Sequence, residues 1–122
     1  MDDDQRGASA SGGLRDAWET VDRLYEWLDS HNRKAPQEAL LLRMLKLSEE
    51  VGEVAQAVIG ATGQNPRKGT SHTWDDVQAE LCDVIVTAMV ALRTLTPDAA
   101  QVLAGHLHRV DQRSRGAGEA ED

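Results

Sequence analysis

Apolar residues recur at three- and four-residue steps along most of this 122-residue chain, which is the spacing of one face of an α-helix. Four segments carry this pattern, and no segment alternates apolar and polar residues as a half-buried β-strand does. The predicted helices span residues 14–31, 37–59, 74–95 and 97–113. We therefore expect an all-α fold in the form of a four-helix bundle-like subunit.

Turn and cap residues stand at the expected boundaries of these helices. Pro36 is placed to begin the second helix, and Gly60 and Gly63 are placed to end it. Thr73 is a favourable N-cap for the third helix, and Pro97 suits the first position of the fourth.

The two ends of the chain differ from this middle part in composition. Residues 1–13 are polar, small and glycine-rich, and residues 114–122 have the same character. Such segments lack the apolar surface that would offset the entropy of ordering, so we predict a disordered N-terminal arm and a disordered C-terminal tail. One all-α domain, residues 14–113, lies between them.

The second and third predicted helices are apolar on more than one side. On a helical wheel, one face of the second helix carries Met44, Leu47, Val51, Val54, Ala55 and Val58. One face of the third helix carries Trp74, Val77, Leu81, Ile85, Met89 and Leu92. We expect these two faces to form the core. The remaining apolar residues are more than one four-helix subunit easily covers, so we also expect a partner subunit, in a homodimer or homotetramer.

Five acidic residues interrupt the same two helices, namely Glu49, Glu50, Glu53, Glu80 and Asp83. Glu49 and Glu53 point roughly away from the apolar face of the second helix, and Glu50 lies toward one flank. Taken alone, these three fit an ordinary solvated face. Glu80 and Asp83 form a narrow polar stripe on a helix that is otherwise apolar, where ionised acids are costly unless something compensates them.

Each of the two helices carries one pair of acids three residues apart, Glu50 with Glu53 and Glu80 with Asp83. Each pair projects from one helix face, so antiparallel packing of the two helices would bring four carboxylates together. Hard oxygen ligands favour Mg²⁺, Mn²⁺ or Ca²⁺. So many acids leave an excess of negative charge, which suits a site that holds more than one Mg²⁺ and presents it to phosphates.

The composition narrows the choice of function. The formal net charge is −8, with 13 Lys and Arg against 21 Asp and Glu, which argues against a protein that binds a nucleic-acid backbone. The single cysteine, Cys82, excludes an intramolecular disulfide and fits a reducing cytosol, and we expect it to be a buried structural thiol. No apolar run resembles a signal peptide or approaches the ~20 residues of a membrane span, so we expect a cytoplasmic protein without a membrane partner.

The two acidic motifs together resemble a family signature. Glu49-Glu50-x-x-Glu53 followed by Glu80-x-x-Asp83 resembles the EExxE…ExxD signature of the MazG-like all-α nucleoside triphosphate pyrophosphohydrolases. The flanking words "LKLSEEVGEVAQA" and "ELCDVIVTAMVAL" are similar as well, and the resemblance covers roughly residues 37–95. It implies cleavage of an NTP or dNTP between the α- and β-phosphates, with Mg²⁺, by a dimer or tetramer of helical subunits.

The resemblance also implies a role for each acid. Glu50, Glu53, Glu80 and Asp83 would ligate Mg²⁺, with Mn²⁺ as the alternative metal. Glu49 would be the catalytic carboxylate that orients the attacking water, or would help to hold a further metal. The metals would neutralise the triphosphate and lower the pKa of a bound water, which then attacks in line at phosphorus.

Basic residues around the motifs are candidates for phosphate contacts. Lys46 lies one turn before the first motif, Arg67 and Lys68 lie in the loop "NPRKG", and Arg109 and Arg113 lie on the last helix. Related enzymes often carry an Asn on that helix, and "HLHRVDQRSR" has none. Two alternatives therefore stay open: a related phosphohydrolase of the phosphoribosyl-ATP type, or a non-catalytic helical interaction module whose acids are solvated surface.

Overall fold

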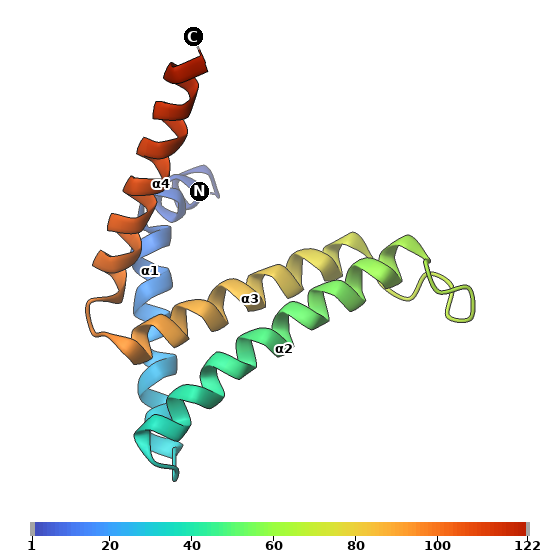
Figure 1. The fold of residues 1–122 in the computed structure, drawn as a ribbon, viewed down its shortest axis with the longest axis horizontal. Coiled ribbons are helices and arrows are strands. Elements are labelled where there is room, and N and C mark those ends of the chain that lie inside the picture. Colours follow the sequence, from blue (N-terminus) through green and yellow to red (C-terminus); the bar gives the residue numbers. More distant parts are fainter. Residues whose placement is uncertain (1, 122) are drawn as a thin grey trace.

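The computed structural model describes the backbone of residues 2–121 and the side chains of residues 13–117. The chain forms four helices: α1 (Asp2–His31), α2 (Pro36–Thr62), α3 (Trp74–Leu95) and α4 (Ala99–Glu121). The described residues include no β-strand, so the predicted all-α class is confirmed. Figure 1 shows α2 and α3 as a long antiparallel hairpin, with α1 crossing one end of it and α4 leaving from the same end.

The start of α3 follows from its first residues. The Thr73 hydroxyl accepts a hydrogen bond from the Asp76 N–H at 3.2 Å, and the Asp76 carboxylate accepts one from the Thr73 N–H at 2.8 Å. This reciprocal capping box satisfies two backbone donors that would otherwise lack partners. The backbone N–H of Thr73 also lowers the pKa of Asp76 by stabilising the ionised carboxylate. The predicted N-cap is therefore confirmed.

The end of α2 differs from the prediction at one of its two glycines. Gly63 is the C-cap, with φ 66° in the left-handed region, and its N–H donates to the Ile59 carbonyl. Gly60 instead stays helical and buried, because the returning loop passes over it. A Cβ at that position would collide with the ring of His72, so this glycine permits a close approach rather than ending the helix.

The chain ends are helical over most of the segments for which the sequence predicts disorder. The backbone of α1 begins at Asp2 and that of α4 extends to Glu121. The predicted arm and tail, residues 1–13 and 114–122, include Met1 and Asp122, which lie outside the described residues. Disorder of these ends in solution stays a prediction.

The small buried core lies where α1, α3 and α4 meet. It consists of Trp18 and Val21 from α1, Val90 from α3 and Ala99 from α4. Partly buried residues pack around it: Leu24, Met89, Leu92, Ala100 and Leu103. This core holds α1 and the start of α4 against one end of the hairpin.

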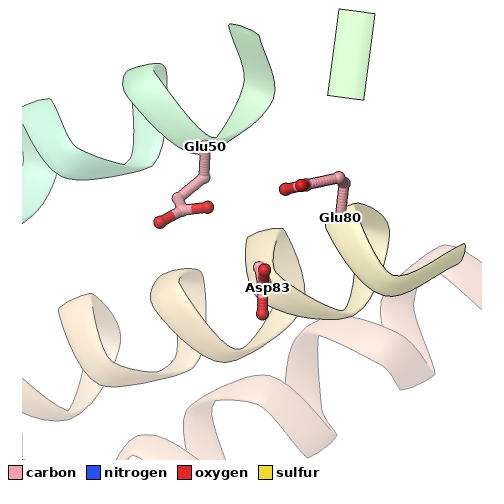
Figure 2. Close-up of side chains that lie close together, drawn as sticks. All are labelled: Glu50, Glu80 and Asp83. Atoms are coloured by element: carbon pink, nitrogen blue, oxygen red, sulfur yellow. The ribbon is translucent and has the colours of Figure 1, made fainter. Parts of the chain in front are cut away.

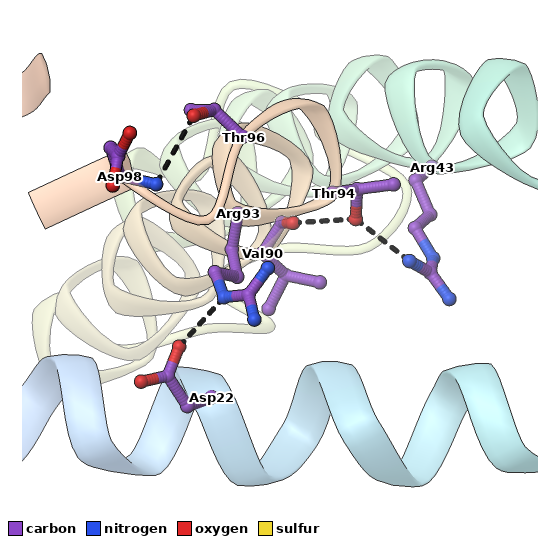
Figure 3. Close-up of polar contacts among 7 residues, drawn as sticks. All are labelled: Asp22, Arg43, Val90, Arg93, Thr94, Thr96 and Asp98. Atoms are coloured by element: carbon purple, nitrogen blue, oxygen red, sulfur yellow. Dashed lines mark hydrogen bonds and ion pairs between the residues drawn. The ribbon is translucent and has the colours of Figure 1, made fainter.

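Polar contacts reinforce the junction of α1 with the hairpin (Figure 3). The Arg93 Nε donates to the Asp22 carboxylate at 2.9 Å. The Arg93 guanidinium also lies 4.3 Å from the ring centroid of Tyr25. The Arg43 guanidinium donates to the Thr94 hydroxyl at 2.7 Å. It also lies 5.5 Å from the centroid of the Tyr25 ring. Two cations thus flank one aromatic ring and join α1, α2 and α3.

The four helices do not close around one common core. The chain exposes 9388 Å², whereas a compact monomer of this mass exposes about 6,500 Å². Figure 1 shows the reason, since the hairpin extends well beyond α1 and α4. No helix in the described part of the chain is both long enough and apolar enough to cross a membrane.

The apolar faces predicted as core are only partly buried within the single chain. The exposed fractions are 52% for Val51, 58% for Trp74, 47% for Leu81 and 58% for Ile85. The prediction of a buried core from these faces is therefore confirmed only in part, since these four side chains are exposed while the following residues of the same faces are buried or half-buried: Val77, Met44, Leu47, Val54, Val58, Met89 and Leu92. The lone thiol, Cys82, is exposed on α3 as well, which corrects its predicted burial.

The contact between α2 and α3, which we call the seam, explains why these apolar side chains are exposed. The buried residues of α2 are Glu50, Ala57 and Gly60, and those of α3 are Val77, Val90 and Ala91. Of these, Gly60 lies under the returning loop and Val90 belongs to the core with α1 and α4. Several of them are small, so the two backbones approach closely. The seam thus uses a flank of α2 on which the wheel had placed an acid, and it leaves Val51 of the predicted apolar face exposed.

Candidate metal centre

Three carboxylates from two helices converge at the seam of the hairpin. Glu50 on α2 and Glu80 and Asp83 on α3 each place one oxygen so that the three atoms lie within 4.8 Å of one another. Figure 2 shows the three side chains directed into the same space between the helices. Glu50 is buried, Glu80 is half-buried and Asp83 is exposed, so the cluster has a closed inner side and an open outer side.

The antiparallel register brings these residues together. The bond from Arg43 to Thr94 fixes the hairpin near its open end. The packing of α2 against α3 thus brings one acid of the first motif, Glu50, to both acids of the second.

The charge in this cluster is poorly compensated. Glu80 Oε2 is buried and has no hydrogen-bond partner among the described residues. The nearby carboxylate of Glu50 above all, then burial and the carboxylate of Glu80, raises the pKa of Glu53 above its ordinary value. An orphaned buried oxygen costs free energy, and a bound cation would remove that cost. The residues present therefore fit a metal ion.

Lys46 supplies part of the missing positive charge. Its Nζ lies 3.4 Å from Glu50 Oε1 and 3.7 Å from Glu49 Oε2. The hydrogen bond to Glu50, with the negative charges of Glu49 and Glu50, raises the pKa of Lys46. The lysine therefore stays charged at the edge of the cluster, where a phosphate of a bound ligand would also lie.

The chemistry of the donors indicates which ions fit. The converging atoms are all carboxylate oxygens, which suit Mg²⁺, Mn²⁺ or Ca²⁺ better than soft transition metals. Of the four predicted metal ligands, Glu50, Glu80 and Asp83 converge directly. Glu53 lies beside them, near enough to Glu50 and Glu80 for their charges to raise its pKa. The predicted catalytic residue, Glu49, is exposed and shares Lys46 with Glu50.

Four of the five predicted phosphate contacts lie away from the acids within one chain. Arg67 and Lys68 are in the loop beyond Gly63, which is about 20 Å along the helix from Glu50 at 1.5 Å per residue. Arg109 and Arg113 line a separate hollow on α4 with His106 and Gln112. Lys46 is the predicted contact that the fold brings to the cluster.

A groove beside the acids was missed by the sequence analysis. It has a volume of about 530 Å³ and lies between the end of α1, the first half of α2 and the second half of α3. Trp27, His31 and Arg43 are among its lining residues, and none of them was singled out from the sequence. The i,i+4 spacing of Trp27 and His31 at a helix end was the one available signal, and it is a weak one.

Comparison of this chain with protein-family models, with curated proteins and with solved structures gave no match. The resemblance to the MazG-like enzymes therefore rests on the two acidic motifs and their flanking residues, and family membership stays a prediction.

Proposed function

We propose that this chain is a Mg²⁺-dependent nucleotide pyrophosphohydrolase that converts an NTP or dNTP to the monophosphate and pyrophosphate. The main support for this proposal is that Glu50, Glu80 and Asp83 each place one carboxylate oxygen within 4.8 Å of the other two. Those are three of the residues on which the resemblance to the MazG-like family rests, and their spacing in the sequence does not by itself require them to meet. The orphaned Glu80 oxygen supports a cation rather than solvated surface.

The carboxylates of the two helices would bind the metal. Glu50, Glu53, Glu80 and Asp83 would hold Mg²⁺, with Mn²⁺ as the alternative. When bound, the metal supplies positive charge to the phosphates and makes a nearby water more acidic.

The chain's own residues would then position the reactants. Glu49, exposed beside the cluster, would orient the attacking water and accept its proton. The water oxygen forms a bond to phosphorus, the bond to the bridging oxygen breaks, and pyrophosphate leaves. Lys46 would contact the phosphates, where it would exchange carboxylate partners for phosphate oxygens.

We propose further that the working form is a homodimer or homotetramer joined through one face of the hairpin. Leu42 and Val51 are nine residues apart on α2, and Leu81 and Val90 are nine apart on α3, so each pair points in opposite directions. Leu42 and Val90 line the groove next to α1. Val51 and Leu81 therefore face away from α1.

We call this second side, with Val51, Trp74, Leu81 and Ile85 exposed on it, the bare face. The chain exposes far more surface than a compact monomer, and the excess is larger than the ~800 Å² that each partner contributes to a standard interface. A second copy placed against the bare face would turn two hairpins into one four-helix bundle.

Pyrophosphate release from a panel of nucleoside triphosphates in Mg²⁺ tests the activity, with phosphoribosyl-ATP included for the alternative substrate. We expect turnover of at least one (d)NTP, and a loss of about 100-fold or more in kcat for Glu80→Gln and Asp83→Asn, since each removes a metal ligand. Asp75→Asn, an exposed acid on the same helix, is the matched control and should stay within about twofold. Absence of turnover, together with no thermal stabilisation by Mg²⁺ and a nucleotide analogue, would contradict the proposal.

A further inference from the structure

The groove and the acid cluster lie on the same side of the hairpin. Lys46 lines the groove, and its Nζ is also 3.4 Å from Glu50 in the cluster. Thr87 lines the groove as well and follows Asp83 by one turn of α3. A ligand that occupied the groove would therefore extend past Lys46 directly to the carboxylates.

The groove differs sharply in charge from the rest of the molecule. The chain has a net charge of −8, yet no carboxylate is among the described residues that line the groove. Its polar lining includes Lys34, Arg43, Lys46 and His31, and its floor is formed by leucine and valine side chains. Apolar walls with a few cationic groups suit a ligand that has a flat apolar part and an anionic end.

One wall of the groove is an exposed aromatic residue held in a defined orientation. Trp27 is 59% exposed, although large aromatic side chains are usually covered. Its ring lies 5.0 Å from that of His31, centroid to centroid. The His31 Nδ1 donates to the Trp27 carbonyl oxygen at 2.7 Å, because a carbonyl only accepts. In the tautomer that makes this bond, Nε2 is the ring atom that could accept from a ligand N–H.

We propose that this groove binds the base and sugar of a nucleotide, with the base stacked on Trp27 and the phosphates passing Lys46 to the acid cluster. The inference rests on the proposed function for the direction of the phosphates. Binding of the base to the groove does not require the metal or the reaction. A planar ring that carries N–H donors matches the Trp27 surface and the His31 acceptor, and the volume of about 530 Å³ lies in the range of small-molecule sites.

Binding without metal tests the groove separately from catalysis. Titration of the full chain in EDTA with dTMP, dCMP, dAMP and dGMP, by calorimetry, should give measurable affinity for at least one of them. We expect Trp27→Ala to weaken that affinity about 5- to 100-fold, the range for loss of one base–aromatic stack. Trp27→Phe should restore most of it. Leu14→Ala is the matched control, since Leu14 is 61% exposed on the same helix and far from the groove.

A ligand without a base provides the second control. Tripolyphosphate in Mg²⁺ should bind with equal affinity to the wild type and to Trp27→Ala, because it reaches only Lys46 and the acids. If Trp27→Ala weakens tripolyphosphate as strongly as the nucleotide, or weakens neither, the groove does not hold the base. A change in molecular mass for Trp27→Ala would also overturn the proposal, since it would identify the groove as a contact between copies.

The two proposals fail in different ways. If dNMP binding depends on Trp27 but no triphosphate is hydrolysed, the groove binds the base and the proposed reaction is wrong. If triphosphates are hydrolysed with dependence on Glu80 while Trp27→Ala leaves KM unchanged, the reaction stands and the groove assignment is wrong.

Discussion

The two faces of the α2–α3 hairpin differ in almost every property. The face toward α1 opens onto the acid cluster, the cationic groove and the contacts of Arg93 with Asp22 and Tyr25. The bare face exposes four large apolar side chains, Val51, Trp74, Leu81 and Ile85. The hairpin thus presents the acid cluster and an apolar groove with a few cationic side chains on one side, and an uncovered apolar surface on the other.

The two faces have opposite effects on the stability of the hairpin. Carboxylates at the seam destabilise the hairpin unless a cation joins them, because like charges repel at close range. The apolar face compensates only if something removes it from water. We therefore expect the single chain to be a weak fold that gains stability from a second copy on one face and from a metal ion on the other.

A charge placed on the bare face should have the largest effect. We expect Ile85→Asp to convert an oligomer to a monomer, because an aspartate buried in an apolar interface costs several kcal/mol. Light scattering after size exclusion measures the mass, and circular dichroism shows whether the helices persist. Leu14→Asp, at an equally exposed leucine of α1, should leave the mass unchanged. An unchanged mass for Ile85→Asp would mean that the bare face is not the interface.

Removal of a charge from the acid cluster should have the next largest effect. Whether it raises or lowers the free energy of unfolding should depend on whether Mg²⁺ is present. Mg²⁺ at about 100 times its Kd should raise the free energy of unfolding of the wild type by about 2.7 kcal/mol, and that of Glu80→Gln by very little. Without metal, Glu80→Gln should be as stable as the wild type or more so, because a like charge has gone from the cluster. Thermal unfolding with and without Mg²⁺ measures both effects, with Asp75→Asn as the control. Equal Mg²⁺ stabilisation in both proteins would exclude Glu80 as a ligand.

Loss of the contacts between α1 and the hairpin should have a smaller effect on the free energy of unfolding, and it should not disturb the bare face. We expect Arg93→Ala to lower the free energy of unfolding by about 1–2 kcal/mol, since it removes a partly buried ion pair and a cation–π contact. Urea unfolding measures the change. The oligomer mass should stay the same, and a fall to monomer would show that the two faces are coupled.

The pH dependence of Glu53 should be the smallest effect. The raised pKa of Glu53 means that the folded chain binds this proton more tightly than the unfolded chain. Without metal, its contribution to stability is thus present at low pH and is lost as pH rises through the raised pKa. The melting temperature of Glu53→Gln relative to the wild type should therefore increase from about pH 4.3 to neutral pH. A constant difference across this range would contradict the raised pKa.

Much of the secondary structure could be predicted from local signals. The Thr73 cap and the end of α3 at Leu95 are where the sequence predicts them. Gly60 was misjudged as a helix end because its role depends on His72, which returns to it from the loop. The acids of the two motifs were found from their spacing, whereas the groove was missed because its walls come from three separate helices.

By itself, the sequence determined which residues carry the acids and which stripes are apolar, because helical periodicity is a property of one segment. It did not determine which stripe would face the neighbouring helix. The tertiary structure decided this, since α2 and α3 bury the small residues Ala57 and Ala91 and the bond from Arg43 to Thr94 joins the two helices. That choice buries Glu50 beside Glu80 and turns Val51 and Leu81 to solvent, because a helix that presents one face to its neighbour must present the opposite face elsewhere.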